Sequence, residues 1–152
     1  MVAIVLGLTL RVVMLTLPPI VTPDSFARYE PLGHNLAAGH GYSTALAPPY
    51  APDATTQPGY PLFLAGAYLV AGESRRTVVV AQMLVELLVL ICIWRLARLI
   101  DFPPAAQAAV MTMALLCPVL PVLARAIWSE AVATVMLTAT CLAWLTAVRT
   151  GG

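Results

Sequence analysis

Long apolar runs alternate with one long polar stretch along the chain. Residues 77–100 form an almost uninterrupted apolar run of 24 residues. As a helix this run is about 36 Å long, which exceeds the roughly 30 Å hydrocarbon core of a bilayer. A similar apolar run begins the chain, and two more follow residues 77–100. The pattern predicts an all-α, polytopic transmembrane protein with about four spanning helices, at residues 1–21, 77–100, 105–123 and 129–149.

A shorter apolar run at residues 60–71 decides the predicted topology. Twelve residues give only about 18 Å of helix, which suits an interfacial or re-entrant helix better than a full crossing. The distribution of arginines does not decide between the two arrangements, since both place three on one side and four on the other. Length therefore favours the arrangement in which residues 60–71 do not span.

The polar stretch at residues 22–58 contains the signals of short surface helices. Asp24 follows Pro23 and suits a helix N-cap, with Arg28 one turn further along. Pro31 is expected to kink or divide this helix, and Gly39 to end it. We predict two short amphipathic helices on the membrane surface, followed by an extended proline-rich segment. Residues 22–76 then form one outer loop, and a loop this long is where function is expected.

Composition and charge narrow the class of protein. Hydrophobic residues make up 61% of the chain and charged residues only 10%, unlike a soluble domain. The net charge of +1 argues against nucleic acid as a partner. The three cysteines are far apart within apolar runs, and His34 and His40 lack the spacing of a metal pair. The sequence predicts no cofactor and no metal site, and leaves a divalent metal ion open.

Two charged residues fall inside apolar runs, where a charge costs about 2.5–3.5 kcal/mol. They are Arg11 in the first run and Glu86 in the second. One interpretation is a structural ion pair between two helices. The other is that Arg11 points into a cavity and binds an anionic ligand. The sequence leaves both open.

One carboxylate, Asp24, lies at the start of the loop, and another, Glu130, lies at the start of the last predicted helix. Asp24 either caps the helix that follows it or acts as a general base at the membrane surface, with Arg28 and Tyr29 near it. Glu130 either faces the dipole of its own helix or serves as a second acid of the same site. The second reading requires that residues 60–71 do not span, because only then do Asp24 and Glu130 share a side.

The loop resembles a known family in its order of motifs. Pro23-Asp24 is followed by Tyr29, by Asn-Leu-Ala-Ala-Gly-His-Gly-Tyr-Ser at 35–43, and by Gln-Pro-Gly-Tyr-Pro-Leu-Phe-Leu-Ala at 57–65. Arg-Ala-Ile-Trp-Ser-Glu at 125–130 also fits. This order is similar to the N-terminal part of the GT-C-fold membrane glycosyltransferases, the group of the dolichyl-phosphate-mannose protein mannosyltransferases and the bacterial aminoarabinose transferases.

The resemblance implies transfer of a sugar from a polyprenyl-phosphate donor to an acceptor hydroxyl on a protein, lipid or glycan. It implies a multi-pass protein of the cell membrane that works at the outer face, with Asp24 as base or site organiser and Glu130 as its counterpart. Side chains expected to bind substrate are Arg11, Arg28, Tyr29, His40, Tyr42 and Tyr60.

The chain departs from this family in two respects, and other functions compete. Pro31 and Gly33 interrupt what is a smoother helix in family members, and those proteins are several times longer. We therefore expect residues 1–152 to be one membrane domain and the N-terminal part of a longer enzyme, incomplete alone. The alternatives are a small non-catalytic membrane subunit or remnant, and a transporter that uses Arg11 and Glu86.

Overall fold

The computed structural model describes residues 2–151, so Met1 of the predicted first helix and Gly152 lie outside it. Within these residues every regular element is a helix, which confirms the all-α prediction. The elements are α1 (Val2–Thr16), the π-helical η1 (Ser25–Tyr29), α2 (Glu30–Ala37), α3 (Gly59–Ala71), α4 (Arg75–Leu99), α5 (Pro104–Leu116), α6 (Val119–Arg125) and α7 (Glu130–Thr150).

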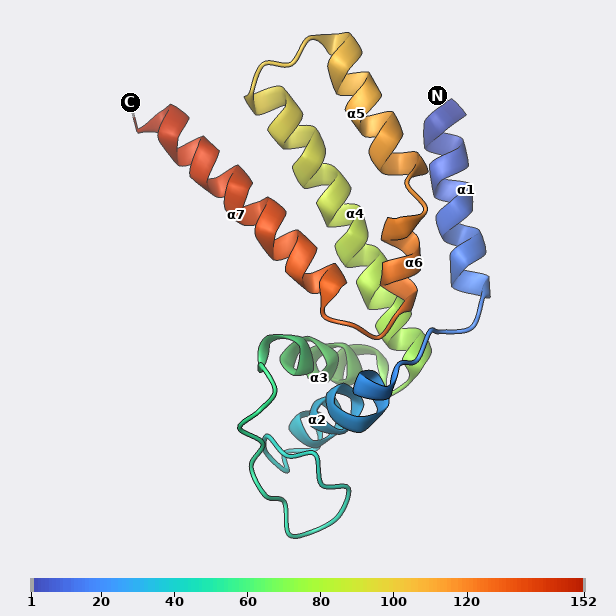
Figure 1. Cartoon of the computed structure of the whole chain (residues 1–152), viewed down its shortest axis with the longest axis vertical. Coiled ribbons are helices and arrows are strands. Elements are labelled where there is room, and N and C mark those ends of the chain that lie inside the picture. Colours follow the sequence, from blue (N-terminus) through green and yellow to red (C-terminus); the bar gives the residue numbers. More distant parts are fainter. Residues whose placement is uncertain (1, 152) are drawn as a thin grey trace.

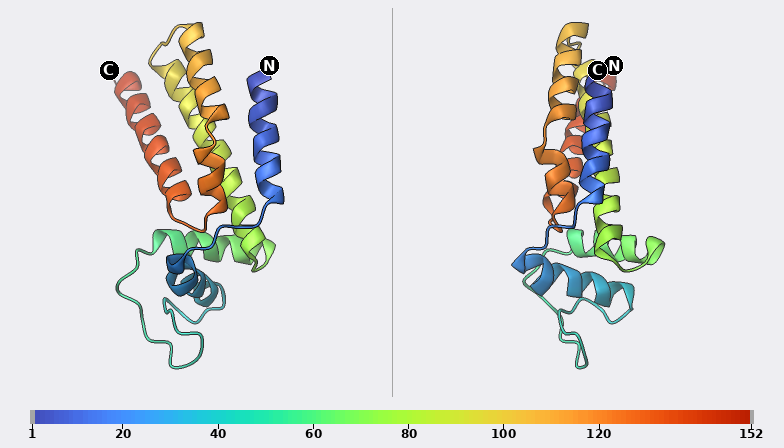
Figure 2. Two further views of the ribbon diagram at one scale, coloured as in Figure 1. Left: turned by 45° about the vertical axis from the view of Figure 1, so that its right-hand side comes forward. Right: turned by 90° about the vertical axis from the view of Figure 1, so that its right-hand side faces the viewer.

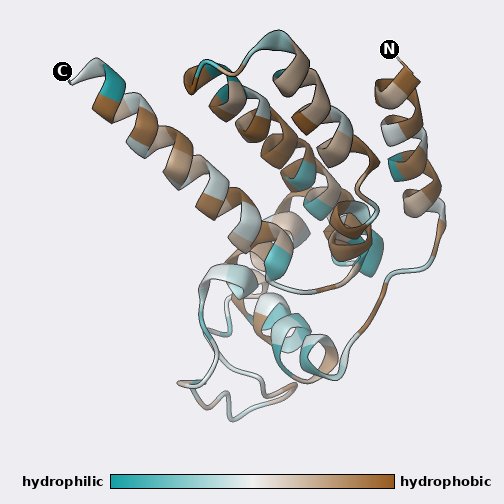
Figure 3. Cartoon of the chain, turned by 45° about the horizontal axis from the view of Figure 1, so that its top comes forward, coloured by the Kyte–Doolittle hydropathy of each residue, from teal (hydrophilic) through white to brown (hydrophobic). Residues whose placement is uncertain are grey.

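The long apolar helices form a bundle in which α1, α4, α5 with α6, and α7 run along one axis (Figure 1). Three segments within residues 2–151 are long and apolar enough to cross a membrane: Arg75–Leu99, Pro104–Arg125 and Glu130–Thr150. Figure 3 shows apolar residues along these helices and more polar ones in the loop. α1 is apolar but has only 15 residues, because Pro18 and Pro19 follow its end and cannot continue the hydrogen-bond ladder.

The segment Pro104–Arg125, which the sequence predicts as one helix over residues 105–123, is interrupted. α5 ends at Leu116, Cys117 has an extended backbone with ψ of 114°, and α6 begins after Pro118. Pro118 has no N–H to donate and its ring disfavours a helical conformation at Cys117. The break frees the carbonyl of Leu115, whose helical partner would have been the N–H of Val119.

The loop helices lie crosswise at one end of the bundle (Figures 1 and 2). α3, the short apolar run, packs mainly against α2 and does not run along the bundle axis. Pro31 does not divide the first loop helix into two separate pieces, because Tyr29 and Glu30 keep helical backbone angles where the wider η1 passes directly into α2. Gly39 ends α2 with a φ of 79°, and the N–H of His40 donates to the carbonyl of Asn35 at 2.8 Å.

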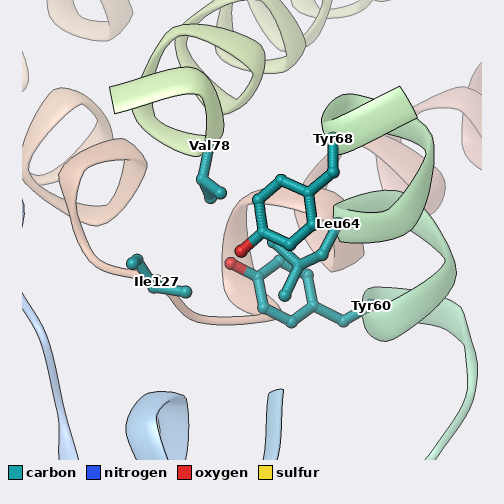
Figure 4. Packing of buried hydrophobic residues seen from close by; sticks show 5 residues of the cluster. All are labelled: Tyr60, Leu64, Tyr68, Val78 and Ile127. Carbon is teal, nitrogen blue, oxygen red and sulfur yellow. The ribbon is translucent and has the colours of Figure 1, made fainter. Parts of the chain in front are cut away.

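A small core joins α3, α4 and the corner between α6 and α7. Its buried members are Tyr60, Leu64, Tyr68, Val78 and Ile127 (Figure 4). The hydroxyl of Tyr60 donates to Oε1 of the fully buried Gln82 at 2.8 Å. The amide of Gln82 in turn donates to the carbonyls of Ala124 and Ala126, at 2.9 and 2.7 Å. Through Gln82, α3 is thereby fixed to α4 and to the corner between α6 and α7.

Candidate functional site

A short backbone bridge places Asp24 and Glu130 at the same end of the bundle. Ile20 and Ala126 form an isolated parallel bridge. The N–H of Ile20 donates to the carbonyl of Arg125 at 2.9 Å, and the N–H of Ile127 to the carbonyl of Ile20 at 3.1 Å. Asp24 and Glu130 each lie four residues beyond the bridged pair, and parallel segments leave a bridge in the same direction. The bridge therefore holds Asp24 and Glu130 at the end of the bundle where the loop helices lie.

Asp24 makes no capping hydrogen bond, so the reading of this residue as an N-cap is wrong. Thr22 takes that role instead: its Oγ1 accepts from the N–H of Ser25 at 3.1 Å. Ser25 Oγ reciprocally accepts from the N–H of Thr22 at 2.7 Å, as in a capping box. The Asp24 side chain is 65% exposed, and its Oδ1 lies 4.0 Å from Nε of Arg28. The carboxylate is therefore open to a ligand.

Aromatic residues connect the helix that carries Asp24 to α3. The rings of Tyr29 and Tyr60 meet edge to face with centroids 5.0 Å apart. Burial raises the pKa of Tyr60, and the neighbouring tyrosines and the charge of Glu130 raise it further. Glu130 is thus close enough to act electrostatically on Tyr60, and its side chain at the start of α7 is exposed.

The other two predicted loop residues, His40 and Tyr42, make their contacts within the loop itself. The His40 ring stacks on Tyr50 with centroids 4.3 Å apart. The Tyr42 hydroxyl donates to the carbonyl of Thr56 at 2.8 Å. Burial raises the pKa of Tyr42, and the charges of Asp53 and Tyr29 add to the effect. No contact in the structure joins His40 or Tyr42 to Asp24 within residues 2–151.

The side chain of Arg11 forms its hydrogen bonds inside the bundle. The side chain is buried and forms a bidentate ion pair with Glu86, with Nε donating to Oε2 at 3.1 Å. Nη1 donates to the carbonyl of Gly7 at 2.8 Å and to the freed carbonyl of Leu115 at 2.9 Å. These are the contacts expected of a structural ion pair. Because its donors have internal partners, Arg11 is not carried into the proposal for substrate binding.

An apolar groove between α3 and α4 was not predicted from the sequence. It has a volume of about 730 Å³. Arg76 contributes a cation, Ser74 and Thr77 contribute hydroxyls, and the remaining lining is Phe63, Gly66, Ala67, Val70, Ala71, Val80, Ala81 and Leu84. Arg76 reads in the sequence as a solvated loop charge. The signal that marks it is its place at the first turn of a spanning helix, beside a short apolar run.

Within residues 2–151 no three or more histidine, cysteine, aspartate or glutamate side chains gather in a way that would hold a metal ion. The side chains that gather at the described site carry carboxylate, guanidinium, hydroxyl and apolar groups. These are suited to general acid–base catalysis and to binding an amphipathic anion.

The fold and the site define a multi-pass membrane protein with a carboxylate-bearing loop domain at one end of its bundle. Comparison with protein families matches residues 52–152 to the family model described as dolichyl-phosphate-mannose-protein mannosyltransferase. The chain belongs to this family, whose members are GT-C-type membrane glycosyltransferases. No curated protein and no solved structure matches the chain.

Proposed function

We propose that the loop end of this bundle forms a site that transfers a sugar from a polyprenyl-phosphate donor to an acceptor hydroxyl at the outer face of the cell membrane. The observation that carries the proposal is the uncapped, exposed carboxylate of Asp24 on a surface helix whose start is fixed by Thr22 and Ser25. Family membership supports the class of reaction.

In the proposed reaction Asp24 takes the proton of the acceptor hydroxyl. The acceptor oxygen then forms a bond to the anomeric carbon while the bond from that carbon to the phosphate oxygen breaks. The electron pair leaves with the polyprenyl phosphate, which is an activated leaving group without any nucleotide. Arg28 lies one turn from Asp24, where its charge favours the negative phosphate. Glu130 is the proposed second acid of the site.

The groove between α3 and α4 suits the lipid part of the donor. Its walls are almost wholly apolar, as an isoprenoid chain requires, and Arg76 supplies a positive charge that attracts the anionic donor to the groove. α3 lies crosswise at the bundle end, so a chain in this groove remains at the level of the bilayer surface while its head extends toward the loop. Tyr60, expected from the sequence to bind substrate, is buried in the core and is left out of the proposed binding surface. Tyr29, whose ring rests edge to face on Tyr60, is proposed to lie beneath the sugar.

The experiment that tests the proposal replaces Asp24 by Asn in the protein in its membranes and measures transfer from a radiolabelled polyprenyl-phosphate sugar. We expect Asp24→Asn to abolish transfer, because an amide cannot accept the proton, while the amount of inserted protein stays unchanged. Glu130→Gln is expected to lower transfer as well. Near-normal transfer by Asp24→Asn would refute the role of the carboxylate.

Asp53→Asn is the matched control, since it makes the same change in the same loop. Asp53 Oδ1 accepts from the N–H and hydroxyl of Thr55 at 2.6 and 2.8 Å, and an amide oxygen can accept both. The hydroxyl of Thr56 donates to Oδ2 at 3.0 Å and can reverse its role to accept from an amide. We expect this variant to retain transfer.

A further inference from the structure

A cluster of arginines lies at the end of the bundle opposite the loop helices. Arg95 and Arg98 lie near the end of α4, and Arg149 near the end of α7. The two helices diverge toward this end (Figure 1), and a hollow of about 400 Å³ lies between them. Its lining consists of the three arginines together with Leu99, Leu142 and Thr146. The proposed glycosyl transfer makes no use of this hollow.

The positive charge at this hollow is only partly balanced. Nη2 of Arg149 donates to Oδ2 of Asp101 at 2.5 Å, and the Arg149 side chain is still 48% exposed. Within residues 2–151, Arg95 and Arg98 form no salt bridge. Both side chains are exposed. Three guanidinium groups and one carboxylate leave the hollow with an excess of positive charge, which attracts an anion.

The surroundings of the arginines indicate what kind of anion fits. The guanidinium carbons of Arg98 and Arg95 lie 5.2 and 5.9 Å from the ring centroid of Trp94. Tryptophan with arginine at the end of a spanning helix is typical of the headgroup level of a bilayer. Leu99 of α4 and Leu142 of α7 add apolar surface to the hollow, against which an acyl chain can lie. A free inorganic anion would use the charge but not this apolar lining.

We propose that this hollow binds an anionic diacyl phospholipid. Its phosphate lies among Arg95, Arg98 and Arg149, and one acyl chain lies along Leu99 and Leu142. The site joins the ends of α4 and α7 by electrostatic attraction to a shared ligand, at the membrane face opposite the glycosyl-transfer site. It is independent of the proposed function, because neither its residues nor its ligand take part in sugar transfer.

Native mass spectrometry of the purified chain in detergent tests the proposal. The probes are phosphatidylglycerol and phosphatidylcholine with identical acyl chains. We expect preferential retention of phosphatidylglycerol. Arg95→Gln/Arg98→Gln should lose about five-fold in affinity per arginine removed. Asp101→Asn should gain affinity, since it removes the carboxylate that pairs with Arg149 and competes for the cluster.

The matched control is Arg28→Gln/Arg75→Gln, which removes equal charge at the other end and should keep the preference. Helix content and the thermal midpoint are measured for each variant, and the expected gain in Asp101→Asn does not depend on how well the glutamine variant folds. Equal retention of both lipids by the unmodified chain, or an unchanged preference in Arg95→Gln/Arg98→Gln, would overturn the proposal. Displacement of the lipid by excess inorganic phosphate would overturn the contribution of the acyl chain.

In a Trp128→Phe/Trp144→Phe background, fluorescence locates the lipid. We expect brominated phosphatidylglycerol to quench Trp94 at lower concentrations than brominated phosphatidylcholine. Equal quenching by the two lipids would place the bound phosphatidylglycerol elsewhere on the protein and would overturn the assigned site.

Discussion

Arg11 and Glu86 show at the scale of single residues how a membrane helix tolerates charge. Arg11 makes four hydrogen bonds, two to Glu86 and two to backbone carbonyls. We expect Glu86→Gln to lower the midpoint of thermal unfolding in detergent, because it leaves the buried guanidinium without a counter-charge. The loss is on the order of 3 kcal/mol for a broken buried pair.

Glu73→Gln is the control for this prediction, because it removes a carboxylate of a pair that is open to solvent. Glu73 Oε2 lies 2.8 Å from Nδ1 of His34, and its side chain is 55% exposed. Exposed pairs contribute only about 0–1 kcal/mol, so little change is expected. Equal shifts of the midpoint in Glu86→Gln and Glu73→Gln would contradict the structural role of the buried pair.

Tyr68 gives a prediction about alkaline stability. Burial, followed by the charges of Glu30 and Glu73, raises the pKa of Tyr68 to about 12, above the value of about 10 in an unfolded chain. Because the folded state holds the proton more tightly, this contribution to stability is complete below pH 10 and is lost between about pH 10 and 12. Tyr68→Phe should therefore show a smaller fall in thermal midpoint across that range. A fall equal to that of the unmodified chain would contradict the assignment.

The sequence predicts which residues carry unusual chemistry better than it predicts which groups they contact. It offers the Arg11–Glu86 pair as one interpretation, because two charges in apolar runs need compensation. It does not predict that Thr22 and Ser25 cap the first loop helix and leave Asp24 free, since Asp24 has the better local capping signal. Gln82 also goes unnoticed, because its importance comes from carbonyls more than forty positions away.

At the scale of secondary-structure elements, the packing of α2 against α3 depends on Gly33. A Cβ on Gly33 would lie 2.7 Å from the Cβ of Leu64, so the two helices touch at this point. We expect Gly33→Ala to destabilise the loop helices by about 1–3 kcal/mol through overpacking. Thermal unfolding, together with proteolysis of the 38–58 loop, measures the effect.

Gly66→Ala is the matched control on α3, because a Cβ there meets nothing within 4 Å. That substitution should stabilise the helix by about 0.5–1 kcal/mol, through the lower conformational entropy of alanine in the unfolded chain. If both alanine variants change stability in the same direction, close packing at Gly33 is not what holds α2 against α3.

Helix positions follow from the hydrophobic pattern, whereas helix breaks depend on tertiary partners. The apolar runs at residues 77–100 and 60–71 correspond to α4 and α3. The break at Cys117 and Pro118 is not predicted, because a proline inside an apolar run is compatible with a kinked but continuous helix. In the structure the break is stabilised from outside, since Arg11 satisfies the carbonyl of Leu115 and Gly7 packs against the same residue.

The crosswise orientation of α3 determines, at the scale of the whole molecule, which groups share a face. With α3 at the bundle end, Asp24 and Glu130 lie at the same end of the molecule, and the arginine cluster of α4 and α7 lies at the other. The arginine count of the sequence does not predict this arrangement, because both topologies give the same division. What decides it is the set of contacts that fix α3 to α2, Gln82 and the α6–α7 corner.

Single cysteines on either side of α3 test this topology directly. In a background with Cys92, Cys117 and Cys141 replaced by alanine, Ala54→Cys precedes α3, Glu73→Cys follows it, and Phe102→Cys lies beyond α4. We expect a membrane-impermeant maleimide to label the first two from the same side of sealed vesicles, and the third only from the other side. A spanning α3 would instead place residues 54 and 102 together and residue 73 opposite. That result would separate Asp24 from Glu130 and would remove the second acid from the proposed site.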